Sequence, residues 1–333
     1  MTVRERLDQE ELRTLSPYAV ASVHTKGRLR PKEPCDVRTE FERDRGSIIH
    51  CSSFRRLKHK TQVFLTPEGD HYRTRLTHTL EVGQIARVIA RALRMNEDLT
   101  EAISMGHDLG HPPFGHAGEF TLARLCPEGF AHNEQSLRVV DVLEKHGEGL
   151  NLCYEVRDGI LCHTGSQMPA TLEGRIVRFA DRIAYINHDL DDAIHAGVLS
   201  PSDLPEACTK VLGSTYKQRI NTLVVDIIET SMDRPCIGMS AEKEEAMDRL
   251  RSFLFDAVYR NPTVKSEESK ASEMLSLLYH HYTAYPDKLP VLYQDPSRGS
   301  VERRVCDYIA GMSDVYATAV FRELFIPEGW NKA

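Results

Sequence analysis

Residues 105–119 read Met-Gly-His-Asp-Leu-Gly-His-Pro-Pro-Phe-Gly-His-Ala-Gly-Glu, and the rest of the chain can be interpreted around them. The stretch holds three of the chain's 15 histidines and two carboxylates, and its Gly and Pro residues restrict the backbone. His107 and Asp108 are neighbours, so on a helix their side chains would point roughly 100° apart and could reach one ion from the same side. An imidazole nitrogen and a carboxylate oxygen together suit Mn, Fe, Zn, Ni or Mg. A single His-Asp pair is common by chance, so a metal site requires further ligands elsewhere.

The composition is that of an ordinary globular protein. Of the 333 residues, 41% are hydrophobic and 27% are charged. The net charge of −7 argues against a dedicated nucleic-acid binder, although a local basic patch stays open. No apolar run approaches the roughly 18–20 residues that span a bilayer, and the first residues lack a signal-peptide core. The 8 cysteines include no Cys-x-x-Cys pair, which favours free thiols in a reducing compartment. We therefore expect a cytoplasmic protein without a membrane segment.

Hydrophobic periodicity predicts an all-α chain. Residues 75–95 are the clearest helix, and strand-like alternation is nearly absent. A helix is also expected over residues 40–57, and the helix that carries Met105 is expected to stop at Gly110, before two prolines. The chain is expected to form three segments of one cooperative unit: residues 1–37 as a helix and extended connector, residues 38–200 as a core, and residues 201–333 as a C-terminal helical extension.

Two other segments offer metal ligands. His78 faces the same side as the apolar stripe of the 75–95 helix, where a lone histidine is more often a hydrogen-bonded core residue. Asp181, Tyr185, Asp189 and Asp192 share one face of a later helix. That face is either a solvated acidic stripe or the wall of a polar cavity with a metal ion at one end.

In combination, the order of His78, the His107-Asp108 pair and Asp181 resembles the ligand set of the HD-domain metal-dependent phosphohydrolases. The resemblance implies a divalent ion (Mn, Mg, Fe, Ni or Zn) on these four residues, with positions left for water or substrate. It also implies an HD-domain helical bundle with additional C-terminal helices. Longer motifs, spread from about residue 38 to residue 325, are similar to the dGTP triphosphohydrolase family and its short bacterial branch. These motifs are Phe54-Arg-Arg-Leu57, Lys60-Thr-Gln-Val-Phe64, Arg75-Leu-Thr-His78, the stretch from His107 to Glu119, His132-Asn-Glu-Gln-Ser136 and Asp307-Tyr-Ile-Ala-Gly-Met-Ser-Asp314.

The resemblance implies a reaction at the α-phosphate of a deoxynucleoside triphosphate (dNTP), which yields deoxynucleoside and tripolyphosphate. His116 is then the candidate proton donor or base, and Glu119, one turn later, would orient it as in other histidine–carboxylate pairs. His111 and His132 would meet the phosphates or the scissile bond, and Arg75 would meet a phosphate oxygen. The alternative readings are a turn-stabilising role for His116 and a helix-terminal charge for Glu119.

The sugar also has candidate contacts. Gln62 and Val63 stand where the family senses the sugar, and a ribose 2′-hydroxyl would clash there. Tyr185 would stack under the sugar, and Asp189 would accept its 3′-hydroxyl or a donor on the base side.

The resemblance also implies basic residues that bind the triphosphate. Arg303 or Arg304 would reach it, unless that helix face is only solvated, and Lys210, Lys217 and Arg219 are weaker candidates. The Asp307–Asp314 motif is interpreted as a structural packing element. The resemblance further implies a homo-oligomer, often a hexamer in relatives, and in some members a second dNTP as activator.

Two other functions stay open. An HD-domain phosphohydrolase acting on a nucleoside monophosphate, a cyclic nucleotide or a guanosine polyphosphate would need the same metal ligands but not Gln62 or the His116–Glu119 segment. A catalytically weak protein that binds nucleotides or single-stranded nucleic acid would show a lost ligand, or a basic stripe with interleaved aromatic residues. All four ligands are present and the net charge is −7, so this last function is the least favoured.

Overall fold

The computed structural model describes residues 1–62, 73–260 and 262–327, so Val63 lies outside the described residues. Within these ranges the chain forms helices and two isolated β-bridges but no strand, which confirms the all-α prediction. None of the described helices is long and apolar enough to cross a membrane. The helices are, in chain order, α1 (Val3–Thr14), α2 (Glu40–Ile49), α3 (Ser52–Arg56), α4 (Arg75–Ala92), α5 (Glu97–Gly106), α6 (Gly115–Leu125), α7 (His132–Arg138), α8 (Glu144–Gly147), α9 (Tyr154–Cys162), α10 (Leu172–His195), α11 (Glu206–Leu212), α12 (Tyr216–Ser231), α13 (Ala241–Leu254), α14 (Pro262–Ala284), α15 (Val291–Gln294), α16 (Val301–Ala310) and α17 (Asp314–Phe325).

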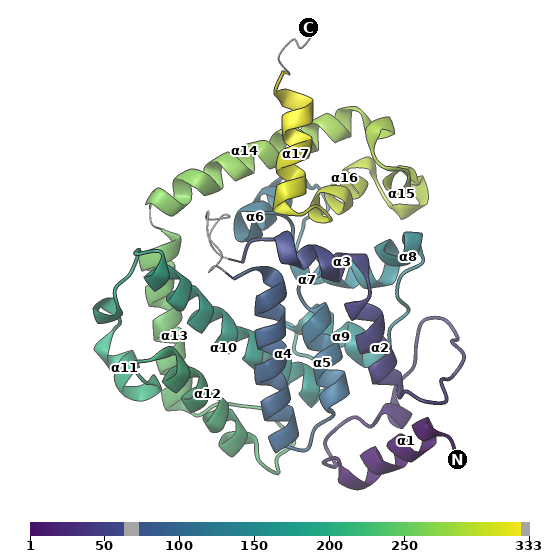
Figure 1. Cartoon of the computed structure of the whole chain (residues 1–333), viewed down its shortest axis with the longest axis vertical. Coiled ribbons are helices and arrows are strands. Elements are labelled where there is room, and N and C mark those ends of the chain that lie inside the picture. Colours follow the sequence, from purple (N-terminus) through teal and green to yellow (C-terminus); the bar gives the residue numbers. More distant parts are fainter. Residues whose placement is uncertain (63–72, 261, 328–333) are drawn as a thin grey trace, which may run out of the picture.

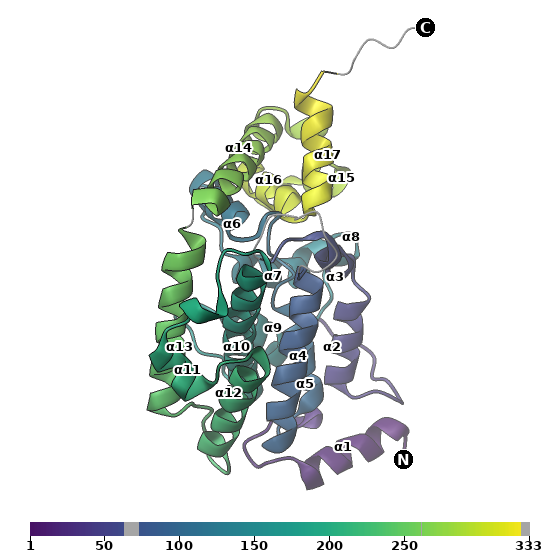
Figure 2. The same ribbon diagram turned by 60° about the vertical axis from the view of Figure 1, so that its left-hand side comes forward.

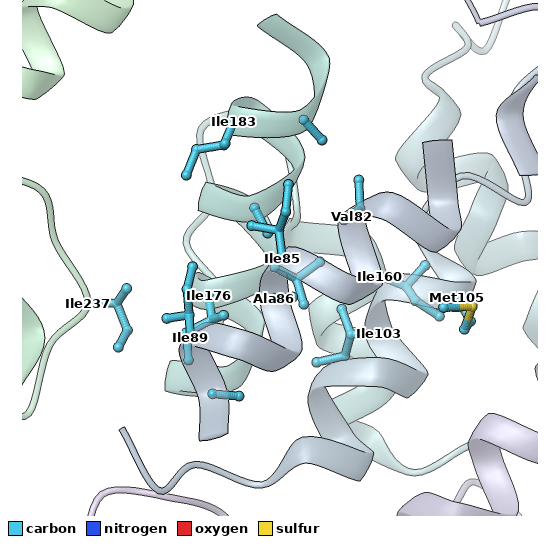
Figure 3. Close-up of a cluster of buried hydrophobic side chains, with 14 of the residues drawn as sticks. Val82, Ile85, Ala86, Ile89, Ile103, Met105, Ile160, Ile176, Ile183 and Ile237 are labelled. Atoms are coloured by element: carbon cyan, nitrogen blue, oxygen red, sulfur yellow. The ribbon is translucent and has the colours of Figure 1, made fainter. Parts of the chain in front are cut away.

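Helix α4 is the centre of the bundle. It begins at a capping threonine, Thr74, whose side chain accepts from the backbone N–H of Thr77. It packs against both α5 and α10, and α5 in turn packs against α2 and α9 (Figures 1 and 2). Burying each large aliphatic side chain of this interface contributes about 1.5–3 kcal/mol. Figure 3 shows this core, formed by Val82, Ile85, Ala86 and Ile89 of α4, Ile103 and Met105 of α5, Ile160 of α9, and Ile176 and Ile183 of α10.

The C-terminal helices α14, α16 and α17 gather at the end of the bundle where α6 lies (Figures 1 and 2). Phe114 and Leu122, from the α6 region, share a buried apolar cluster with Leu275 of α14 and with Val305 and Ile309 of α16. The C-terminal extension therefore packs directly on the segment that follows the Pro-Pro pair. Such packing is what one cooperative unit requires.

Two predicted helix ends are wrong. The helix expected over residues 40–57 breaks after Ile49, because Cys51 caps a separate short helix, α3, by accepting from the backbone N–H of Phe54. The helix expected to reach Gly110 already ends at Gly106, so His107 is its C-cap and Asp108 follows in a turn.

The early end of α5 has a side-chain cause. Ring nitrogen Nδ1 of His107 lies 2.6 Å from the carbonyl oxygen of Ser104. In a continuing helix that carbonyl would accept from the backbone N–H of Asp108. The His107 ring replaces this bond, and the chain turns away.

Candidate metal centre and active site

The four predicted metal ligands meet in the fold. His78 comes from the first turns of α4, His107 and Asp108 from the end of α5, and Asp181 from the middle of α10. Nε2 of His78 lies 3.2 Å from Oδ1 of Asp181 and 3.9 Å from Oδ2 of Asp108. Nε2 of His107 lies 3.5 Å from Oδ1 of Asp108 and 3.8 Å from Oδ1 of Asp181. Ligand atoms that share an ion through bonds of about 2.0–2.2 Å lie at similar separations, roughly 3 Å or slightly more.

The chemistry of the donors also fits a divalent ion. Because Nδ1 of His107 donates to the Ser104 carbonyl, Nε2 must carry a lone pair. That Nε2 is fully buried and has no hydrogen-bond partner in the described part of the chain. His78, His107 and Asp108 each offer a ligand atom within 4.8 Å of the others. A buried, unpartnered lone pair facing carboxylates is what a metal ligand requires.

The carboxylates of this cluster are kept ionised. Burial opposes ionisation of Asp108, but the positive charge of the Arg75 guanidinium favours it, and the pKa of Asp108 stays well below the usual range. Arg75 is itself buried and donates to Oδ2 of Asp108 at 2.7 Å. When no ion is bound, a hydrogen on Nε2 of His78 can donate to Asp181, and this bond outweighs burial and lowers the pKa of Asp181 to about 2.

A second histidine cluster shares the site. Nδ1 of His132 and its backbone N–H both lie 2.8 Å from Oε1 of Glu119. The other ring nitrogen of His132 lies 3.2 Å from Nε2 of His163. Since Nδ1 of His163 donates to the Ile160 carbonyl at 2.7 Å, its Nε2 can only accept. His132 must therefore carry a proton on both nitrogens and be a cation.

The pKa directions agree with this assignment. Burial favours neutral His132, but the hydrogen bond to Glu119 outweighs it and raises the pKa of His132. Burial would raise the pKa of Glu119, yet its hydrogen bonds to histidines hold it far below the usual range. Burial lowers the pKa of His163 to about 3 and also keeps His111 neutral by lowering its pKa.

The predicted His116–Glu119 pair is looser than the His132–Glu119 pair. Nδ1 of His116 lies 3.7 Å from Oε2 of Glu119, and the His116 side chain is 55% exposed. His111 bridges the two clusters, because its Nε2 lies 3.6 Å from Oδ1 of Asp108 and its ring stacks on His132 at 4.0 Å. Glu119 therefore serves both His116 and His132.

Both clusters open into one cavity of about 530 Å³, within the roughly 300–1,000 Å³ typical of small-molecule sites. Gln62 and Tyr185 line it, and Oε1 of Gln62 has no hydrogen-bond partner among the described residues. Asp189, one turn after Tyr185 on α10, is fully buried and does not line the cavity. Burial and the nearby Asp192 raise its pKa well above the usual range.

Three arginines that the motifs did not indicate line the same cavity: Arg178, Arg182 and Arg251. Arg178 and Arg182 are one turn apart on α10 and flank Asp181, so helical spacing could have indicated them. Arg251 comes from α13, and no sequence signal connects it to the metal ligands.

The arginines predicted near the C-terminus lie elsewhere. Arg303 donates to Gln135 and to Asp307, and Arg304 is buried against the carbonyl oxygens of Tyr293, Gln294 and Gly299. Neither lines the cavity, nor do Lys210, Lys217 and Arg219. The structure does not bring these five residues to the site, because other groups already hold the two C-terminal arginines and Arg219.

The Asp307–Asp314 motif holds in place the loop of residues 107–114, which carries the site. Oδ1 of Asp314 accepts from the backbone N–H of Phe114 at 2.9 Å, and Oδ2 accepts from the backbone N–H of Thr61 at 2.8 Å and from its hydroxyl. Buried Lys60 donates to the carbonyl oxygens of His111 and Ala310. These contacts to the C-terminal helices thus fix the backbone just before Gln62 and on both sides of the Pro-Pro turn.

Comparison with known proteins agrees with this architecture. Residues 75–186 match the HD domain, and residues 237–323 match the phosphohydrolase-associated domain. A deoxyguanosinetriphosphate triphosphohydrolase-like protein from Caldanaerobacter subterraneus subsp. tengcongensis is 54% identical, over 99% of this chain and 98% of the relative. A protein of the same description from Desulfatibacillum aliphaticivorans is 49% identical, over 98% of this chain and 99% of the relative.

A solved structure shares the fold. The crystal structure of a hypothetical protein from Aquifex aeolicus matches with a TM-score of 0.50 and 20% identity, over 86% of this chain and 68% of that one. The near full-length identity to the curated relatives, together with the metal cluster, identifies a metal-dependent phosphohydrolase. The chain belongs to the HD-domain deoxyguanosinetriphosphate triphosphohydrolase-like family.

Proposed function

We propose that this protein hydrolyses dNTPs at the α-phosphate to deoxynucleoside and tripolyphosphate. One observation carries the proposal: a metal cluster and a cationic histidine face each other across one cavity. Asp108 joins the two, since its Oδ2 accepts from Arg75 and its Oδ1 faces His111, which stacks on His132. A reaction that needs both an electrophile for a phosphate oxygen and a nearby proton donor would use this arrangement.

An ion held by His78, His107, Asp108 and Asp181 would polarise an α-phosphate oxygen and acidify a water molecule. The chain's own groups would do the rest. The His132 imidazolium places positive charge beside the phosphates, and Glu119 keeps that charge in place. His116, at the open side of the cavity, can give a proton to the departing 5′ oxygen and recover one from the water. The water oxygen bonds to the α-phosphorus as the bond to the 5′ oxygen breaks, so atoms and protons balance.

Substrate contacts follow from the cavity lining. Arg251 is our candidate for a bidentate contact with the triphosphate. Arg178 and Arg182 add positive charge at the cavity wall, where Arg178 donates to three backbone carbonyls and Arg182 to Asp248. Gln62 is buried with its carbonyl oxygen unpartnered among the described residues, and Tyr185 offers a ring face. These two groups are our candidates for sugar recognition.

The test is a product assay. The purified protein is incubated with each of the four dNTPs, alone and in pairs, with Mn²⁺ or Mg²⁺, and the products are separated by ion exchange. We expect deoxynucleoside and tripolyphosphate, and none from His107→Ala. Orthophosphate or pyrophosphate as the first product would overturn the proposal. Nucleoside monophosphates, cyclic nucleotides and guanosine polyphosphates are run in parallel, and preferential turnover of any of them would identify a different HD phosphohydrolase.

The paired incubations also test activation by a second dNTP, which would appear as faster hydrolysis of one nucleotide in the presence of another. Light scattering coupled to size exclusion tests the predicted homo-oligomer. These two properties, and the cytoplasmic location, stay predictions.

A further inference from the structure

A buried histidine and a partly exposed glutamate lie behind the metal ligand His78, on the side of its other ring nitrogen. Nδ1 of His78 lies 3.2 Å from Nδ1 of His188, and both rings are buried. On the far side of the second ring, Nε2 of His188 lies 3.3 Å from Oε2 of Glu81. The proposed mechanism uses neither His188 nor Glu81.

Only one proton can lie between the two Nδ1 atoms. If His78 carries it, Nε2 of His78 has a lone pair that faces Asp108 and Asp181, and Nε2 of His188 carries a hydrogen towards Glu81. If His188 carries it, every position reverses. Nε2 of His78 then points a hydrogen into the ligand cluster, and the lone pair of His188 faces a carboxylate.

Carboxylates lie at both ends of the ring pair: Asp181 is 3.2 Å from Nε2 of His78, and Glu81 is 3.3 Å from Nε2 of His188. A divalent ion between His78 and the aspartates would remove the attraction of Asp181 for a hydrogen on His78, and the charge of Glu81 then decides the tautomer. A lone pair 3.3 Å from a carboxylate oxygen is repelled, whereas an N–H at that distance is attracted. Glu81 therefore favours the arrangement in which His78 can bind a metal ion.

Glu81 is itself held in place. Nε of Arg73 lies 3.2 Å from Oε2 of Glu81, and the same guanidinium contacts Asp191 at 3.0 Å and Asp192 at 2.6 Å. The ring of Tyr216 stacks on His188, with centroids 6.2 Å apart and planes 22° apart. This arrangement links α4, α10 and α12 around one histidine tautomer.

We propose that His188 and Glu81 are positioning residues that hold His78 in the tautomer with its lone pair at Nε2, and so preorganise the metal site. The proposal rests on the metal site of the proposed function, but not on the identity of the nucleotide. Partners at the outer nitrogen of a ligating histidine typically set its metal affinity by about 10- to 100-fold.

Calorimetric titration of the metal-free protein with Mn²⁺, without nucleotide, tests the proposal. His188→Leu removes the acceptor for the His78 N–H and should weaken Mn²⁺ binding by about 10- to 100-fold. Glu81→Gln should weaken it as well, because its amide can donate to Nε2 of His188 and favour the wrong tautomer. The matched control is His195→Leu, a histidine on the same helix with a 64% exposed side chain, which should bind Mn²⁺ like the parent.

Glu81→Gln is the decisive variant, since Glu81 is 37% exposed and its replacement leaves the core intact. If this variant binds Mn²⁺ with parent affinity, the proposal is overturned. The tautomer is read directly from nitrogen-15 shifts of labelled histidines with Zn²⁺ bound. His78 should be protonated at Nδ1 in the parent, and protonation at Nε2 would contradict the proposal. A protein that depends on Glu81 for Mn²⁺ but hydrolyses no dNTP would keep this inference and refute the proposed function.

Discussion

The two histidine clusters of this site share Asp108 and His111 as neighbours but differ in charge. In the metal cluster, the ring of His107 donates its one proton to the Ser104 carbonyl, which leaves a lone pair facing the site. In the second cluster, Glu119 and His163 hold both nitrogens of His132, which makes that ring a cation. The partner at the outer ring nitrogen therefore decides whether a buried histidine becomes a ligand or a charged donor.

Removing a ligand from the metal cluster should have the largest effect. His107→Ala deletes the unpartnered Nε2, so the variant should lose Mn²⁺ binding at this site. Because a catalytic ion supplies several kcal/mol of charge stabilisation, hydrolysis should fall by at least about 10³-fold. Steady-state product release and Mn²⁺ titration measure both quantities. Retained hydrolysis with lost Mn²⁺ binding would break the link between this cluster and catalysis.

Neutralising the second cluster should have the next largest effect. Glu119→Gln removes the charge that keeps His132 protonated, and hydrolysis should fall by about 10²–10⁴-fold, the usual range for acid–base groups. Mn²⁺ affinity should change little, because Glu119 is not a ligand of the first cluster. Glu134→Gln, an exposed residue on the helix of His132, is the control and should match the parent. Equal losses of Mn²⁺ binding and activity in Glu119→Gln would show that the two clusters are not distinct.

The pH dependence of hydrolysis tests whether His132 is a cation, which is the difference between the two clusters. The pKa of His132 is raised above its ordinary value of about 6.5 by Glu119, against the effect of burial. The stabilisation from this pair is fully present below that ordinary value and is lost as the pH rises through the raised pKa. Parent activity should therefore persist above about pH 6.5 and decline as His132 loses its proton. In Glu119→Gln the decline should begin at a lower pH, and an unchanged alkaline limb would contradict the assignment of His132.

The metal cluster could be predicted from the sequence, and most of its surroundings could not. The spacing of His78, His107 and Asp108 in a recognisable order was sufficient, because motif and helix periodicity agreed. His163 and His188 look like isolated histidines in the sequence, since their ring partners lie 31 and 110 residues away. Tertiary contacts alone give these two rings their roles.

Helix periodicity also missed the end of α5. The bond from the His107 ring to the Ser104 carbonyl spans only three residues, but it is a side-chain contact that periodicity does not record. A motif match placed Arg303 and Arg304 near the substrate, whereas their guanidinium groups are held by partners in the C-terminal helices and the adjoining α7. Long basic side chains can point in several directions, so their targets depend on the final packing.

Loosening the loop that carries both clusters should affect them together. Asp314→Ala leaves the buried backbone N–H groups of Phe114 and Thr61 without their acceptor. Each unsatisfied buried donor costs about 1–3 kcal/mol, so the free energy of unfolding should fall by at least about 2 kcal/mol. Displacement of the loop should lower kcat by up to about 10²-fold. Chemical denaturation and kinetics measure these, with Asp287→Ala, an exposed aspartate, as control. Full activity in a destabilised Asp314→Ala protein would show that the contacts of Asp314 with Phe114 and Thr61 stabilise the fold without positioning either cluster.

The smallest effect separates the cavity arginines from those near the C-terminus. Arg251 is exposed at the cavity, so Arg251→Ala should leave the thermal midpoint nearly unchanged and raise KM for a dNTP roughly tenfold, the value of one solvent-screened, charge-assisted phosphate contact. Arg304 is buried and donates to three backbone carbonyls, so Arg304→Ala should lower the thermal midpoint and leave KM near the parent value. Arg251→Ala should therefore change substrate binding and not stability, and Arg304→Ala should change stability and not substrate binding. If Arg304→Ala raises KM at a temperature where the variant stays folded, Arg304 contacts the triphosphate, as the motifs predict.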